Sequence, residues 1–225
     1  MPPPTFSGFS AEGLTLLRAI GGADRDHFQA NKKAYDELIA TPAKAFVDAM
    51  TAGLQDRISP LVDGQPKTNG SIAPINNDLR FNPDASPYKD HVLFKWWQGP
   101  DKKLAPTVWV RMSPTDVGFA SGIALADLDR WRDAVGGDAG AELATAIDRL
   151  AADRDLDVAG QALKTVPKPY PSDHPRADLL RHKGFQVRWS EPAPKTIGSA
   201  AFVDHCLDRL DLVAPIHHWL VDQLG

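Results

Sequence analysis

The feature that most constrains the fold is a change in hydrophobic pattern at Leu61. Before this residue, apolar side chains recur at helical spacing in three segments, which begin at Ser10, Asp24 and Thr41-Pro42. A capping residue followed by proline is a strong helix-start signal, so the third helix is expected to begin at Thr41. After Leu61, turn residues separate short β-branched and aromatic runs. These runs predict strands at 71–75, 92–97, 107–112 and 117–121, the last two forming a hairpin.

Helical periodicity returns after Gly122. Helices are expected at 125–135, 139–152 and 176–181, a strand at 185–189, and a final helix at 199–224 that Pro215 either kinks or splits. This order predicts an α+β fold with a mostly antiparallel sheet flanked by N-terminal and C-terminal helices. No connection is long enough to mark a boundary. We therefore expect one domain over residues 1–225, with residues 1–8 as an extended lead-in.

Composition and charge exclude several classes of protein. Hydrophobic residues make up 43% and charged residues 24%, as in ordinary globular proteins. Twenty-five Lys and Arg against 29 Asp and Glu give a net charge of −4, which argues against nucleic-acid binding. No apolar run approaches the roughly 18 residues of a membrane span, and the first residues lack the features of a secretory signal. A cytoplasmic location is expected, and the oligomeric state is not indicated.

Several chemistry-bearing motifs are missing from the sequence. The chain has no nucleophile elbow, zinc-protease, dinucleotide-binding or phosphate-loop motif. His217-His218 and Asp204-His205-Cys206 are adjacent on an expected helix, so their side chains point in different directions and cannot share one ion. We predict no metal site and no cofactor, and the sequence does not decide whether the protein is an enzyme.

The densest group of polar side chains lies between Asn77 and His91. In this segment, Arg80 could bind a carboxylate or phosphate, Lys89 supplies a second positive charge, and His91 can donate or accept a proton. Residues 80–111 contain six Lys and Arg against three Asp, a local charge of +3. The structural alternative is that Asp78 pairs with Arg80 and Tyr88 packs in the core.

A second polar group lies on the second expected helix, where Arg25, Asn31 and Lys32 accompany Phe28 and Tyr35. Positions 28, 31, 32 and 35 share one helical face. Either Asn31 and Lys32 reach the segment 77–91 and complete a ligand pocket there, or they form a boundary face on which the aliphatic part of Lys32 covers apolar surface.

The polar segment also carries a family resemblance. Residues 77–82 read N-D-L-R-F-N and residues 86–91 read S-P-Y-K-D-H. They resemble the R-D-T-R-F-S and K-T-P-Y-K-T-H signature of the bacterial family called domain of unknown function 2461, and similar matches run in order from Phe9 to Lys183. The resemblance implies a fold and a site location but no activity. Asn77 and Ala85 stand where the family signature has arginine and lysine, which implies weaker binding of an anion or a less charged ligand.

The sequence therefore predicts binding of a small anionic or polar molecule in a cleft at residues 77–91. The predicted contact residues are Arg80, Lys89, His91, Asp78, Asn77, Tyr88, Asn31, Lys32 and Arg25. An alternative from another class is a protein-interaction module around Trp96-Trp97, with Lys95, Lys102 and Lys103 beside it. Adjacent strand residues point to opposite faces, so one of the two tryptophans would be exposed.

Overall fold

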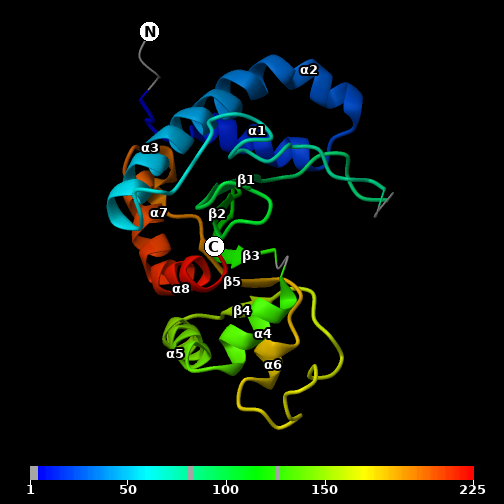
Figure 1. Ribbon diagram of the computed structural model, residues 1–225. Helices are drawn as coiled ribbons and strands as arrows, with labels where there is room; N and C mark the ends of the chain where they lie inside the picture. Colours follow the sequence, from blue (N-terminus) through cyan, green and yellow to red (C-terminus); the bar gives the residue numbers. More distant parts are fainter. Residues whose placement is uncertain (1–4, 81–83, 125–126) are drawn as a thin grey trace. The chain divides into compact units, whose positions relative to one another are not determined.

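The computed structural model describes residues 5–80, 84–124 and 127–225 of the chain (Figure 1). Three parts of the sequence predictions lie outside these residues: residues 1–4 of the expected lead-in at 1–8, Phe81-Asn82 of the signature, and Leu125 at the start of an expected helix. The described chain contains helices and a five-stranded antiparallel sheet of order β1-β2-β3-β5-β4. The predicted α+β fold class is thus confirmed.

The helices and strands have the following bounds. The helices are α1 (Ala11–Gly21), α2 (Arg25–Tyr35), η1 (Asp36–Ala40), α3 (Thr41–Arg57), α4 (Leu128–Gly136), α5 (Ala139–Ala151), α6 (Ala177–Leu180), η2 (Lys195–Gly198), α7 (Phe202–Leu210), η3 (Asp211–Val213) and α8 (Ala214–Leu224). The strands are β1 (Val92–Trp97), β2 (Thr107–Met112), β3 (Asp116–Ile123), β4 (Asp157–Ala159) and β5 (Phe185–Pro192).

Local sequence signals explain most of the helix boundaries. The Ser10 hydroxyl accepts a hydrogen bond from the Gly13 amide at 3.0 Å, and the Asp24 carboxylate accepts one from the His27 amide at 2.8 Å. Both side chains therefore cap their helices, which begin where the sequence predicts. The last helical region is split rather than kinked, because the 3₁₀ turn η3 separates α7 from α8 and Pro215 lies in the first turn of α8.

The predicted start at Thr41 is confirmed, because α3 begins there and Pro42 lies in its first turn, where the missing amide proton costs nothing. Thr41 is not the expected cap, because the π-helical segment η1 continues α2 directly into α3. Two other elements differ from the sequence predictions. Residues 71–75 form no strand of the sheet and make only isolated bridges, such as Ile72 with Phe94. The short strand β4 was not predicted.

The chain divides into two compact units. The first comprises Met1–Trp96, Trp109–Gly118 and Ser190–Arg209, and the second comprises Trp97–Val108, Phe119–Trp189 and Leu210–Gly225. Each unit is assembled from three separate pieces of chain, so the boundary between the units does not correspond to a single linker in the sequence. The prediction that residues 1–225 form one domain stays a prediction.

The core of the first unit is a group of aromatic rings around Phe46. Its ring centroid lies 5.1 Å from Phe6, 4.9 Å from Phe94 and 5.3 Å from Phe202. Phe46 has no exposed surface, and neither have Phe94 and Phe202. The three partners come from the N-terminal segment, β1 and α7, so this one side chain joins distant parts of the sequence.

The core of the second unit is built around Trp131 of α4. Its ring centroid lies 5.1 Å from Phe185 and 5.8 Å from Trp219, and its indole N–H donates to the Leu179 carbonyl at 2.9 Å. The Trp219 indole in turn donates to the Ala139 carbonyl at 2.7 Å. Both buried indole donors are therefore satisfied, as burial of a polar group requires.

Neither tryptophan of the Trp96-Trp97 pair is exposed, which removes the basis of the predicted interaction surface. Trp96 is 0% and Trp97 is 3% exposed, and the Lys102 ammonium lies 5.9 Å from the centre of the Trp97 ring. The two side chains lie on opposite faces of β1. The expectation that one of them would be exposed was wrong because the face that leaves Leu93 and Lys95 half-exposed is covered at Trp97, at the end of the strand.

Candidate functional site

The polar segment is held by backbone pairing between its two arms. The Asn77 amide donates to the Pro87 carbonyl at 2.8 Å, and the Lys89 amide donates to the Ile75 carbonyl at 2.9 Å. The Asn77 side chain adds a bond to the Ser86 carbonyl at 2.8 Å. Asn77 therefore fixes the shape of the segment, a role that needs an amide donor and no charge.

Tyr88 attaches this segment to α2 within the first unit. Its ring stacks on Phe28 with a centroid distance of 4.3 Å, and Phe28 meets Tyr35 at 5.5 Å. Tyr88 is 4% exposed, so it acts as a packing residue. Burial, with a smaller contribution from Asp36, raises the pKa of Tyr35 to about 12. The predicted contact between the second helix and the polar segment is thus present, and it is made by aromatic rings.

Arg80 forms an exposed ion pair with Asp78. The guanidinium donates to both carboxylate oxygens, at 2.9 and 2.6 Å, and the Arg80 amide donates to the same carboxylate at 3.1 Å. The hydrogen bonds from the Arg80 side chain and then its amide lower the pKa of Asp78. The arginine side chain is 83% exposed, so water screens this pair and a competing anion can replace the carboxylate at little cost.

Lys89 is bound to the backbone of the opposite arm. Its ammonium donates to the Pro74 carbonyl at 2.6 Å and to the Asn76 carbonyl. Partial burial lowers the pKa of Lys89. Since an ammonium has three donors, two carbonyl partners leave one for a further acceptor.

His91 lies among charged groups near the end of the segment. Its Nδ1 is 2.9 Å from an Asp90 carboxylate oxygen, and the Arg111 guanidinium on β2 approaches the same oxygen at 3.9 Å. Burial lowers the pKa of His91, the Asp90 hydrogen bond opposes this, and the charges of Arg111 and Lys89 lower it further. A neutral imidazole that donates through Nδ1 to Asp90 presents Nε2 as an acceptor.

Arg111 is held in turn by Asp116, which begins β3. The two form an ion pair, and the Asp116 carboxylate also accepts from the Ser113 hydroxyl at 2.7 Å and the Thr115 hydroxyl at 2.9 Å. Burial alone would raise the pKa of Asp116, but these hydroxyl bonds and the Arg111 charge outweigh it, so the pKa is lowered. The turn between β2 and β3 therefore fixes the position of Arg111.

The polar side chains of α2 bond within their own helical region. The Asn31 amide group donates to the His27 carbonyl at 2.9 Å, and the Lys32 ammonium contacts Asp36 at 2.7 Å. Arg25 is exposed in the first turn. The structure thus brings α2 to the polar segment through Phe28, whereas Asn31 and Lys32 have the boundary-face arrangement that the sequence left as the alternative.

Asp90, Arg111 and Asp116 were missing from the predicted contact residues. Arg111 carries a signal that could have identified it, because it occupies a half-exposed position between the buried residues Val110 and Met112 of β2. A charged residue among β-branched and aromatic neighbours in a strand points to a polar partner nearby. The turn sequence that follows β2 supplies that partner.

The described residues contain neither a metal-binding cluster nor a membrane-spanning helix. Within 5–80, 84–124 and 127–225, no three His, Cys, Asp or Glu side chains are grouped so as to hold a metal ion. In the same part of the chain, no helix combines the length and the apolar character needed to cross a membrane.

These observations describe an α+β protein with a polar segment braced against a helix and the edge of a hairpin. The profile of a family of conserved hypothetical proteins, DUF2461, matches residues 18–219. The match covers most of the chain, so the protein belongs to this family and the resemblance read from its motifs is confirmed. No curated protein and no solved structure matches the chain.

Proposed function

We propose that the protein binds a small anionic or polar molecule at the polar segment, residues 77–91. The observation that carries the proposal is the Asp90 carboxylate oxygen that His91 Nδ1 approaches at 2.9 Å and the Arg111 guanidinium at 3.9 Å. The charges of Arg111 and Lys89 both lower the pKa of this imidazole. Two positive charges beside a neutral histidine favour a ligand with an anionic group and a hydroxyl or amide donor.

Arg80 contributes as a cation that can change partner. Its bond to Asp78 is exposed, and exposed pairs of this kind are weak in water. An oxyanion at the segment would accept hydrogen bonds from the planar guanidinium in two parallel contacts, as the Asp78 carboxylate does in the free protein. Asp78 is then the internal competitor that limits affinity. The absence of the family cations at Asn77 and Ala85 limits it further.

His91 would sense the bound molecule directly. With Nδ1 held by Asp90, its Nε2 accepts a proton or a hydrogen bond from the ligand. A bound anion adds negative charge near the ring and therefore raises the pKa of His91, opposite to the effect of burial. The proposal is one of binding, and no reaction is assigned.

The test is a thermal-shift screen of phosphorylated and carboxylated metabolites against the wild type and Arg80→Ala. A ligand at this site raises the melting temperature of the wild type and raises that of Arg80→Ala less. Arg188→Ala is the matched control, because Arg188 forms an exposed ion pair with Asp157 at 2.7 Å in the other unit. If no compound stabilises the wild type, or if Arg80→Ala responds as the wild type does, the proposal fails.

A further inference from the structure

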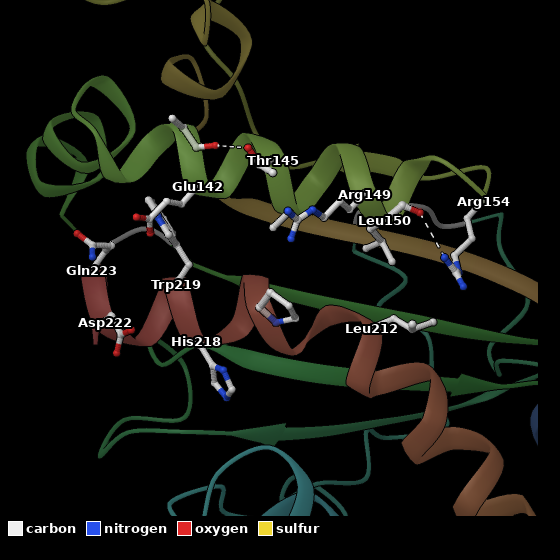
Figure 2. A pocket seen from close by; sticks show the side chains of 13 residues that line it. Glu142, Thr145, Arg149, Leu150, Arg154, Leu212, His218, Trp219, Asp222 and Gln223 are labelled. Atoms are coloured by element: carbon white, nitrogen blue, oxygen red, sulfur yellow. Dashed lines mark hydrogen bonds between the residues drawn. The ribbon is translucent and has the colours of Figure 1, made fainter.

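A pocket lies between α5 and α8 of the second unit, outside the site described above (Figure 2). Its volume is about 630 Å³, within the range of small-molecule sites. Leu150, Leu212, Pro215 and Trp219 supply its apolar lining. Leu212 is 38% exposed, which is unusual for a large apolar side chain in this protein. An occupant that buries Leu212 would remove this surface from water.

The charged residues of the pocket are separated by sign. Glu142 and Asp222 lie at one end and Arg154 at the other, with the Arg149 side chain between them (Figure 2). Glu142 and Arg149 are seven positions apart on α5, which corresponds to about 10 Å along a helix axis. Thr145 and His218 also line the pocket, so it combines polar and apolar surface along its length, with negative charge at one end and positive charge towards the other.

The two arginines of the pocket, Arg149 and Arg154, are not paired with carboxylates of the described residues. Among the residues that the structure describes, neither Arg149 nor Arg154 forms an ion pair, whereas Arg132, Arg181 and Arg188 of the same unit all do. The Arg154 guanidinium stands 5.8 Å from the centre of the Trp189 ring, which holds it in place without neutralising it. A positioned cation without a counter-charge is suited to an external anion.

We propose that this pocket binds a short apolar peptide of about three residues. Three extended residues span about 10 Å, so the ammonium group of such a peptide would face Glu142 and Asp222 while its carboxylate faces Arg149 and Arg154. Its side chains would cover Leu150, Leu212 and Pro215. A fatty acid or other ligand with one charged end would leave the acidic end unused, which is why charge complementarity favours an occupant with both charges.

The experiment titrates tripeptides of Leu, Phe, Val and Ala with free ends into the full chain, followed by calorimetry. We expect saturable binding by at least one peptide. N-acetylation and C-terminal amidation should each weaken it by about threefold to tenfold, the scale of an exposed charge pair. Octanoate, which carries only the negative end, should bind more weakly than the peptide.

Two variants assign each end of the peptide. Arg149→Gln should reduce the difference between free and amidated peptides, and Glu142→Gln should reduce the difference between free and acetylated peptides. Neither variant should abolish its difference, because Arg154 and Asp222 remain. Arg188→Gln, an exposed arginine outside the pocket, should leave both differences unchanged. The proposal is overturned if no tripeptide binds saturably, if neither cap changes the affinity, or if octanoate binds as tightly as the peptide. Arg80→Ala should bind the peptide normally, so this result is separate from the test of the polar segment.

Discussion

The pH dependence of stability should be controlled by His217, a residue of α8 in the second unit. This side chain is 0% exposed, and neither ring nitrogen has a hydrogen-bond partner among the described residues. Burial, with a smaller effect from His218, lowers the pKa of His217 to about 4. In the unfolded chain a histidine titrates near pH 6.5. Between these two values the unfolded state binds the additional proton, so the free energy of unfolding falls as the pH falls.

The two pKa values give the size of the effect. Lowering the pH from 7.5 to 4.5 should cost about 2 to 3 kcal/mol through His217 alone. The assay is urea unfolding at several pH values for the wild type, His217→Leu and His218→Leu. Other histidines whose pKa is lowered, such as His91 and His182, contribute to all three proteins and cancel in the comparison. His217→Leu should lose less stability than the wild type on acidification, and His218→Leu should behave like the wild type. Equal pH slopes for the wild type and His217→Leu would refute the reasoning.

Two further predictions concern stability and are checked by urea unfolding. Phe46→Ala removes a ring with no exposed surface from the centre of the first core and should cost about 3 to 5 kcal/mol, whereas Leu61→Ala, at a side chain 71% exposed, should change stability by less than about 0.5 kcal/mol. Equal effects would contradict the assigned core. Gly160 has φ of +141° and a side chain there would overlap the Gly184 carbonyl, so Gly160→Ala should destabilise by about 2 kcal/mol or more. Gly22→Ala, where a methyl group meets open space, is the control and should remain near the wild-type value.

Much of the fold could be predicted because its signals are local. Helices begin at Ser10 and Asp24 as expected, where both side chains act as caps, and the strands expected at 92–97 and 107–112 have the observed bounds. Pro215 was expected either to kink or to split the last helix, and the structure has the split, with Pro215 in the first turn of α8.

The remaining errors in the fold come from tertiary context. The π-helical segment η1 has no sequence signature separate from that of an ordinary helix, so the sequence did not show that α2 and α3 are joined through it. The three residues of β4 are too few to show alternation, and they are recognisable only through their pairing with β5. The burial of both Trp96 and Trp97 depends on which parts of the chain cover β1. The sequence of the strand itself does not show this.

In the candidate site, too, local contacts could be predicted from the sequence and long-range contacts could not. The nearness of Asp78 to Arg80 is visible in the sequence, and the structure contains that pair. The bonds from Lys89 to the carbonyls of Pro74 and Asn76 depend on how the two arms pair, which residue types alone do not specify. Arg111 lies 3.9 Å from Asp90 because β2 runs beside the polar segment. The two residues are 21 positions apart in different elements, so the sequence alone did not indicate this contact.

The most direct test of the account is an NMR titration of the isotope-labelled protein with inorganic phosphate and with succinate. The account predicts saturable shifts that are largest for the amides of residues 84–91 and for Arg111, together with a rise in the pKa of His91. In Arg80→Ala the shifts should saturate at higher ligand concentration. Shifts that do not saturate, or that are largest outside the polar segment while the pKa of His91 stays unchanged, would contradict the central claim.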